Sequence, residues 1–545
     1  MPSNIQSQMI QDTITYLGKK QKEVFTKHAV WKDNWDDIIT NIIPKHRDAN
    51  LVNQKGEKTG ERLFDSTAKR SNNKVRDNLQ SLLTPPSGKW FEKTTGDREL
   101  DSQEDVKKYL NEVERIILKH INNSNFHTES LSVYEDIPSL GTGVIYIQKA
   151  DKMQQQRRNS LLHFESERIT KVGLLVRKKE VIGVIRCQQW KAREILEEFE
   201  GNLPDDFARN AEKAGEREYE IAQYIFHKSI MPDKFLVGSK PWRSFKVLTS
   251  QKWMLTKPNE GWNHKPFSTP RWHVESDEDY GRGPGSDILP DQKTASAMKK
   301  IILQGGQLAI APPLQVADNG IFRKIKYKPW GINFRKPGKD NRIEPLITGS
   351  RPDIGEQLLA SIQADIEEGY YKKALEIVEN DRMTATEVVA RRDENLRGFG
   401  SVLVRVSEMS RDVVENAFII LERAGELPEA PAALKESKHL SLRYTSLLAR
   451  SQIQAETENF TRAISNLVPL IEVRPEVIDN LDGDFIFRET FHQLAVDDRF
   501  LIKVGQRDKN RQQAAERAQQ QQQVEEGKTQ SETVKNLSAA ESTGV

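Results

Sequence analysis

The sequence contains a single cysteine, Cys187, among 545 residues. One cysteine excludes an intrachain disulfide framework and a zinc site built from several thiolates, and it is typical of a reducing compartment. No apolar run reaches the roughly 18 residues of a membrane span, because prolines and Gln307 interrupt the best candidate, residues 305–317. The first residues lack the continuous apolar stretch of a signal peptide. We therefore expect a soluble, cytoplasmic protein that does not insert into a membrane.

Excess charge of either sign is also missing. The chain has 82 Lys and Arg against 80 Asp and Glu, a formal charge of +2. This balance argues against a tight, sequence-independent grip on nucleic acid along the whole surface. Hydrophobic residues make up only 36%, and charged residues reach 30% against about 25% in ordinary globular domains. The composition favours an elongated protein with much helix surface in water, and the length predicts three or four domains.

Catalytic motifs are missing as well. There is no phosphate-binding loop, no His-Glu-x-x-His pair and no Gly-x-Ser-x-Gly elbow. The alternating Gly281, Gly283 and Gly285 are not spaced as in a dinucleotide fingerprint, so we expect them to serve a turn. The acidic run Asp277 to Asp279, which includes Glu278, could ligate a divalent cation, although a solvated loop is commoner. We expect no catalytic residue, no metal and no cofactor, and the acidic run leaves a metal-dependent nucleic-acid-processing enzyme as an alternative.

Apolar periodicity predicts a chain of helices around a strand-rich region at residues 161–274. The expected helices span residues 62–83, 102–122, 290–303, 354–377 and 442–467. The longest helix follows the capping-box pattern at residues 384–387. Its stripe comprises Leu396, Phe399, Leu403, Val406, Ser410, Val413, Ala417 and Ile420. From Arg507 onward the Gln-rich composition predicts a solvated helix that frays into disorder.

Two of these helices flank an insert of about forty residues, 311–350, with the most uneven charge in the chain. Its basic residues include Arg323, Lys324, Lys326, Lys328, Arg335 and Lys336, interleaved with Tyr327, Trp330 and Phe334. A basic stretch with aromatic residues can bind nucleic acid. It can equally dock a protein partner or form the exposed faces of short strands, since Ile325 and Tyr327 alternate with lysines. These alternatives stay open at the level of composition.

Several motifs, taken in their order and spacing, resemble the head-to-tail connector, or portal, proteins of short-tailed bacteriophages. They lie at residues 62–68, 79–86 with Trp90-Phe91, 141–143 before an apolar strand, and 280–284 before a helix. The most specific is the segment 382–387 with Arg391 and Glu394, followed by the helix that ends at residues 425–428. The similarity extends from about residue 62 to about residue 484. A terminase would need the ATP loop that is missing here.

The resemblance implies an α+β, mostly helical portal fold that assembles as a ring, with a dodecamer as the expected form. Its parts would be a wing, a stem of paired helices, a β-containing clip and a helical crown. The expected boundaries are 1–285 for the N-terminal helices and the β-rich wing, 286–310 and 351–377 for the stem helices, 311–350 for the clip, 378–385 for the tunnel loop, 386–430 for the wing spine helix, 431–506 for the crown and 507–545 for a disordered tail.

The resemblance also implies the function, a channel at the capsid portal vertex through which double-stranded DNA is packaged and ejected. The DNA-facing tunnel loop would comprise Glu379, Asn380, Asp381, Arg382 and Met383. The basic residues of the clip, listed above from Arg323 to Lys336, would dock the terminase large subunit and later the tail adaptor or tail tube proteins. Further expected partners are capsid and scaffolding proteins, with assembly in the host cytoplasm and a final place in the virion. A non-portal coat or internal virion protein is a third alternative.

Overall fold

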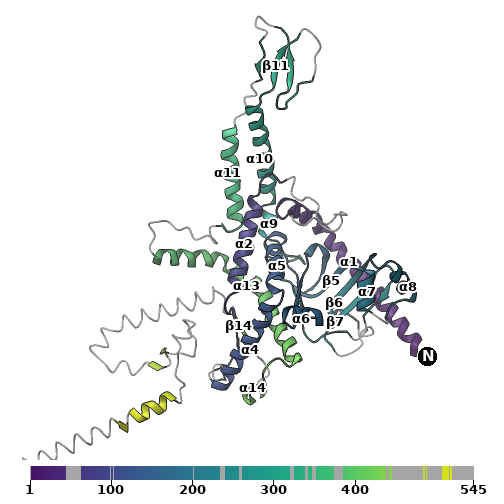
Figure 1. Ribbon diagram of the computed structural model, residues 1–545, viewed down its shortest axis with the longest axis vertical. Helices are drawn as coiled ribbons and strands as arrows, with labels where there is room; N and C mark the ends of the chain where they lie inside the picture. The colour runs from purple at the N-terminus through teal and green to yellow at the C-terminus, as the bar shows by residue number, and fades with distance from the viewer. Residues whose placement is uncertain are drawn as a thin grey trace, which may run out of the picture. The chain divides into compact units, whose positions relative to one another are not determined.

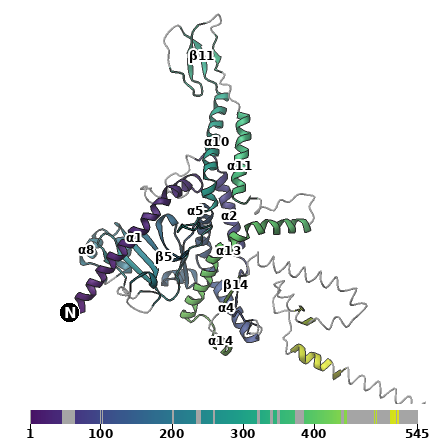
Figure 2. The same ribbon diagram turned by 180° about the vertical axis from the view of Figure 1, so that it is seen from behind.

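The computed structural model describes most of the chain up to residue 444 and short segments beyond. The described residues are 2–44, 63–97, 100–101, 103–199, 202–232, 240–256, 260–318, 324–337, 342–346, 352–372, 385–436, 441–444, 483–484, 486–487, 506–514 and 516–517. The chain forms two compact units, residues 1–448 and 449–545, and the fold below is that of the first (Figures 1 and 2). None of its described helices is both long and apolar enough for a bilayer crossing. In the second unit, residues 506–514 are helical.

Helix α1 (Pro2–Asn41) is one continuous helix, where the sequence predicted several. Its first half packs through Ile14, Leu17 and Val24 into the same apolar cluster as a large β-sheet. Its second half carries an aromatic cluster, in which Trp35 contacts Tyr280 edge-on at a centroid distance of 5.1 Å. Side chains on one helix therefore anchor both the sheet and the segment around Tyr280.

The central helices share one apolar core. They are α2 (Thr67–Leu83), α4 (Glu104–Asn123), α5 (Phe126–Leu140), α13 (Ala385–Ala424) and the short α14 (Ala432–Glu436). The stripe predicted along α13 is buried from Leu403 to Ile420, which confirms its helical periodicity. The side chains of residues 384–399, including the expected capping box, lie outside the described part. The structure corrects the predicted start at residue 62, because Phe64 precedes α2 and is partly exposed.

Two sheets form the strand-rich region. One has the order β10-β2-β3, and the other has the order β4-β5-β6-β7-β8 with β9 paired to β7. Their bounds are β2 (Ile145–Lys149), β3 (Leu162–Ser166), β4 (Val172–Arg177), β5 (Glu180–Lys191), β6 (Glu218–His227), β7 (Trp242–Leu248), β8 (Trp253–Met254), β9 (Gly261–Trp262) and β10 (Phe267–Ser268). Short helices α6 (Lys152–Arg158), α7 (Ala192–Glu198) and α8 (Asp205–Lys213) lie between strands along the chain. A turn at residues 249–252 separates β7 from β8.

Two glycine-containing segments far apart in the sequence, 141–143 and 281–285, pack backbone against backbone. Gly141 has φ +81°, and a Cβ there would lie 2.1 Å from the carbonyl oxygen of Gly281. The Gly281 N–H donates to Thr142 Oγ1 at 2.9 Å. Gly283 precedes α9 (Pro284–Asp287), and Gly285 lies inside it. The turn predicted for the three glycines therefore ends at Gly283, and all three positions lie close to the backbone of residues 137–141.

Helices α10 (Leu289–Ile310) and α11 (Pro352–Gly369) pack against each other and enclose the insert in sequence. Both views show them side by side, with the β11 sheet beyond the end of α10 (Figures 1 and 2). An apolar stripe of residues four apart runs along α11; it is buried at Ile366, whereas Ile354 and Leu358 are exposed. Only the part of the pair next to the helical core is therefore covered within one subunit.

The predicted helix at residues 442–467 is wrong at its start. Residues Ser441–Tyr444 form β14, which pairs antiparallel with β1 (Phe91–Thr94). The available edge of β1 explains the strand, because tertiary pairing overrides local helix propensity. Residues 445–467 lie outside the described part of the chain.

Candidate functional site

The insert folds as a small sheet with the order β12-β11-β13. β11 (Leu314–Ala317) and β12 (Ile332–Arg335) run parallel, with Leu314 opposite Ile332, and β13 (Glu344–Pro345) completes the other edge. A parallel pair needs a crossover between its strands, and part of that crossover is the loop 324–331. The topology therefore places the basic stretch on a loop tied at one end to a sheet.

All but one of the predicted docking residues lie in the described part of this insert. Lys324, Lys326 and Lys328 lie exposed on the loop, while Arg335 and Lys336 lie at the end of β12. Arg335 forms an ion pair with Glu344 at 3.4 Å. The segment 324–337 contains no acidic residue, so the lysines form a basic patch. Arg323 lies outside the described residues.

The same loop presents large apolar side chains to solvent, namely Ile325, Tyr327 and Trp330. Contiguous exposed apolar residues mark interaction sites more often than ordinary surface. The sequence signal for the basic and aromatic residues was their interleaving, and the structure shows that both kinds are exposed together. The interpretation of this segment as strand faces with one packed side does not hold for residues 324–327, which are not in a strand.

The second predicted site, the tunnel loop from Glu379 to Met383, lies outside the described residues. It stays a prediction.

Two residues of the acidic run 277–279 form ion pairs with basic side chains. Glu278 forms an ion pair with Arg282 at 2.5 Å, and Lys27 pairs with Asp279 at 3.2 Å. Within the described part of the chain, no group of three or more His, Cys, Asp or Glu side chains is placed to hold a metal ion. The geometry therefore gives no support to a metal centre at this run.

A buried joint that the sequence analysis missed connects α10 and α11 to α2. Asp65 is only 1% exposed; its carboxylate accepts hydrogen bonds from the Thr67 N–H at 2.9 Å and from Gln363 Nε2 at 2.7 Å. Lys299 lies 3.5 Å away. Burial alone would raise the pKa of Asp65, but the hydrogen bonds from Thr67 and Gln363 and the charge of Lys299 hold that pKa below its usual value. Asp65 thus ties the start of α2 to both long helices.

A second missed cluster surrounds Lys93, in β1 between α4 and α13. Its ammonium group lies 3.3 Å from the centroid of the Phe418 ring. Burial lowers the pKa of Lys93 to about 7, although Glu415, Glu422 and Glu114 oppose that shift. One to two turns earlier on α13, burial raises the pKa of Asp412 to about 6. These groups are charged residues in apolar packing, which periodicity cannot reveal.

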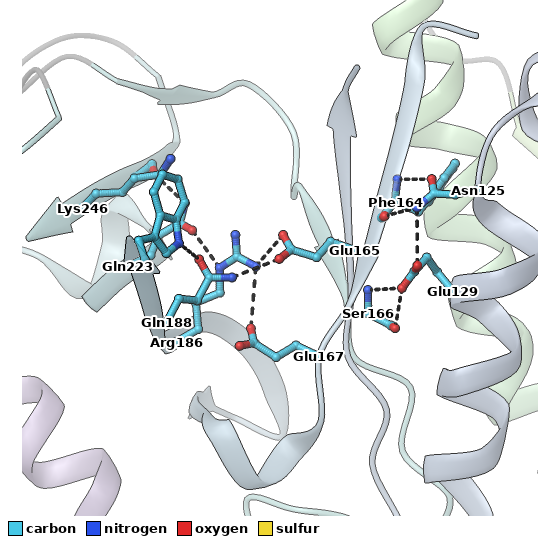
Figure 3. A network of polar contacts seen from close by, with 12 residues as sticks. Asn125, Glu129, Phe164, Glu165, Ser166, Glu167, Arg186, Gln188, Gln223 and Lys246 are labelled. Carbon is cyan, nitrogen blue, oxygen red and sulfur yellow. Dashed lines mark hydrogen bonds and ion pairs between the residues drawn. The ribbon is translucent and has the colours of Figure 1, made fainter. Parts of the chain in front are cut away.

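A polar network joins the two sheets around Arg186 (Figure 3). The guanidinium donates to Glu165 at 2.7 Å and to Gln223 at 2.7 Å, and it lies 4.1 Å from the centre of the Tyr146 ring. Burial raises the pKa of Glu167 to about 7 against the attraction of Arg186, 3.6 Å away. Because strands of both sheets supply these partners, the network fixes one sheet against the other.

The family described as bacteriophage head to tail connecting protein matches residues 17–501. This chain belongs to that family. The match covers the core helices, both sheets, α10, the insert and α11, and it includes α1 from residue 17 onward. As a head-to-tail connecting protein, the chain is a structural component of the phage particle.

Two relatives extend along nearly the whole connector. A probable portal protein of Bordetella phage BPP-1 is 23% identical over 522 residues, 92% of this chain and 90% of its own length. A portal protein of Salmonella phage epsilon15 is 22% identical over 538 residues, 96% of this chain and 95% of its own. Among solved structures, the neck of an empty gene transfer agent particle aligns over 72% of this chain and 86% of its own, with 10% identity and a TM-score of 0.33. That last likeness is too distant to support an argument.

The connector signatures now have physical explanations. The segment around Asp65 forms the joint of three helices. Gly141 packs against Gly281, and Gly283 and Gly285 pack against the end of α5. Trp90 and Phe91 are both buried in the core, as expected for anchors after a turn. The described signatures are therefore packing positions, while the side chains of the segment 382–387 with Arg391 and Glu394 lie outside the described residues. The exposed basic loop at 324–331 belongs to none of these signatures and is the region predicted to dock partners.

Proposed function

We propose that this connector is the portal subunit, which assembles into a ring at the capsid vertex and surrounds double-stranded DNA during packaging and ejection. The observation that carries the proposal is the family match over residues 17–501, together with two portal relatives aligned over 90% and 95% of their own lengths. The family is described as one that connects the phage head to the tail, so the proposed role is structural. In this proposal α10 and α11 form the stem, residues 311–350 the clip, 378–385 the tunnel loop, 386–430 the wing spine and 431–506 the crown.

The exposed apolar surface supports assembly. Residues that one subunit leaves exposed on α10, α11 and the insert include Ile301, Leu303, Ile310, Ile325, Ile332, Ile343, Ile354 and Leu358. A monomer rarely exposes so many large apolar side chains in neighbouring elements. In a closed ring of twelve identical subunits, each stem would cover part of the next.

The charge balance fits a conduit. A ring repeats every surface charge, so a strongly basic lumen would hold DNA by its phosphates and impede movement. With a formal charge of +2 per subunit, the ring can surround DNA without such a grip. At the tunnel loop, Glu379 and Asp381 would partly cancel Arg382 and leave Asn380 and Met383 as neutral contacts.

The clip is the proposed docking site. Its basic residues would bind the terminase large subunit during packaging and the tail adaptor or tail tube proteins afterwards. Capsid and scaffolding proteins would contact other faces of the ring. Assembly would take place in the host cytoplasm, and the finished portal would remain in the virion.

Negative-stain imaging of the purified protein tests this function. We expect rings with a central hole and a particle mass near twelve subunits of 62.4 kDa. A monomer that cleaves nucleic acid only with added Mg²⁺ would contradict the proposal and support the enzyme alternative. Assemblies without an axial hole would instead favour a coat or internal protein.

A further inference from the structure

Trp330 combines two unfavourable properties in the free subunit. Its backbone has φ +56°, in the left-handed region that bulky side chains rarely adopt. Its side chain is 67% exposed, so burial within the subunit does not compensate for the strain. Strained backbone of this kind persists where the surrounding structure imposes it and is concentrated at functional sites.

The surrounding loop is built to hold this conformation. Asn333, 8% exposed, accepts a hydrogen bond from the Lys326 N–H at 2.7 Å and donates one to the Lys326 carbonyl at 3.3 Å. The Gly331 N–H donates to the Lys328 carbonyl at 2.8 Å, and the Gly331 carbonyl accepts from the Leu314 N–H at 2.8 Å. A Cβ at Gly331 would lie 2.6 Å from the Lys326 carbonyl oxygen. These hydrogen bonds hold the loop in a defined turn against β11 and β12, and Trp330 lies within that turn.

The charges around Trp330 are of one sign. Lys324, Lys326 and Lys328 are exposed, and among the described ion pairs the carboxylate of Glu344 goes to Arg335 and not to these lysines. Exposed charges of one sign around an aromatic residue are typical of an interface whose partner carries the opposite sign. Trp and Tyr are also the residues that most often dominate binding energy, in the centre of an interface with a polar rim.

We propose that the loop 324–331 is a preorganised anchor for a protein partner, in which the Trp330 indole enters an apolar pocket rimmed by carboxylates. Tyr327 and Ile325 flank the pocket contact, and the three lysines steer the approach. This inference rests on the docking role proposed for the clip and identifies the chemistry of its partner. A protein pocket suits the indole better than duplex DNA does, because the base faces of a duplex are stacked on each other and aromatic stacking serves single strands.

The preorganised loop also predicts how the binding energy divides between rates. A rigid anchor lowers the entropy lost on binding, and deeply buried contacts act mainly on dissociation. Rim charges act mainly on association and on its salt dependence. Trp330 and the lysines should therefore affect different rate constants.

The test uses assembled rings of the full chain and the purified tail adaptor of the same phage, with rates measured by biolayer interferometry at two salt concentrations. Trp330→Gly removes both the indole and the backbone strain, so it should leave the melting temperature unchanged or raise it while dissociation becomes about 30-fold faster. Reversal of Lys324, Lys326 and Lys328 to Glu should instead slow association and reverse the sign of its salt dependence, because added salt then screens a repulsion. Trp253→Ala, a matched change at a partly exposed tryptophan of β8, should behave as wild type.

Three outcomes would overturn the inference. Wild-type dissociation from Trp330→Gly rings would show that the indole is not an anchor. Loss of the rings themselves in that variant would place Trp330 against a second copy of the chain. Binding of duplex DNA that disappears with Trp330 would assign the loop to nucleic acid. If wild-type protein forms no ring or its rings do not bind the adaptor, the proposed portal function or its docking role fails first, and the anchor fails with it.

Discussion

At the scale of single residues, buried charged side chains fix how helices of the connector pack. Asp65 is the clearest example, because one carboxylate joins α2, α10 and α11 through Thr67, Lys299 and Gln363. A shorter apolar side chain would leave the partly buried Thr67 N–H and the partly buried Gln363 amide without an acceptor. The joint therefore depends on an oxygen at this position more than on the volume of the side chain.

Replacement of Asp65 by Ala should lower the free energy of unfolding by about 1–2 kcal/mol, the cost of leaving two partly buried donors without their acceptor. Because the pKa of Asp65 is lowered in the folded state, its contribution is present above the unfolded pKa of about 3.9 and is lost as pH falls through the folded value. Urea denaturation of wild type and variant at pH 7 and pH 3 measures both effects. Asp77→Ala on the exposed face of α2, whose carboxylate pairs with the adjacent Arg76, is the control and should change stability little.

Lys93→Met should stabilise the protein, by about 1–2 kcal/mol at pH 7, because a buried charge is replaced by an apolar side chain of similar length. The pKa of Lys93 is about 7 in the folded state and about 10.4 in an unfolded chain. The penalty is therefore complete below pH 7 and disappears as pH rises through 10.4, so the advantage of Met should shrink toward pH 10. Melting temperatures across this range measure it, and a pH-independent gain would contradict the assigned cause.

The matched change Lys89→Met should have the opposite sign. Lys89 forms a direct ion pair with the buried Glu114 at 2.8 Å, and its loss would leave that carboxylate without its cation. If Lys89→Met and Lys93→Met change the melting temperature equally, the direct ion pair of Lys89 does not set it apart from Lys93.

Neither Asp65 nor Lys93 could be chosen as a key residue from the sequence. Asp65 lies in the motif at residues 62–68, but nothing in that motif marks the aspartate as a joint between helices, because its partners on α10 and α11 are more than 200 residues away. The importance of Lys93 arises from its burial. The basic residues of the insert were predictable because local composition alone marks them. The strain at Trp330 was not, since φ depends on the hydrogen bonds of the folded loop.

At the scale of elements, prediction succeeded where one face of a helix is buried along its length. The stripe on α13 from Leu403 to Ile420 is buried as expected. Prediction failed at Ser441–Tyr444, where an apolar pattern forms a strand because β1 offers an edge. It also missed α5 and α8; α5 is buried on most sides, so its periodicity is weak.

Helix α10 contains two adjacent glycines in its interior, where glycine is unfavourable. Gly305 and Gly306 lie within it, and a Cβ at either position would meet nothing within 4 Å. Each should therefore tolerate Ala, and each substitution should stabilise the helix by up to about 1 kcal/mol through helix propensity. The melting temperature of the isolated subunit checks this expectation.

Gly141→Ala is the contrasting variant, because its positive φ and the nearby Gly281 carbonyl leave no room for a methyl group. It should destabilise the protein strongly. If both Gly305→Ala and Gly306→Ala raise subunit stability but lower ring yield, the glycines serve close approach of a neighbouring helix rather than the subunit itself.

At the scale of the whole molecule, the low apolar content and the exposed helix pair have one explanation. The composition of 36% hydrophobic residues predicted much solvated helix surface, and the structure shows where one subunit leaves apolar side chains uncovered. On α11, Ile354 and Leu358 are exposed while Ile366 on the same stripe is buried. In the proposed ring, a second surface would cover the other end of this continuous stripe.

Leu358→Glu should therefore prevent ring assembly without unfolding the subunit. The side chain is 55% exposed in the single chain, so a carboxylate there costs the monomer little, whereas burying twelve of them in a ring without partners would cost several kcal/mol for each. Size-exclusion chromatography with light scattering should show subunits of native circular dichroism in place of rings. Val30→Glu, at an exposed position of α1, is the matched control and should assemble normally. Rings of wild-type yield from Leu358→Glu would mean that the exposed half of this stripe does not contact a neighbour, and the low apolar content would then need a different explanation.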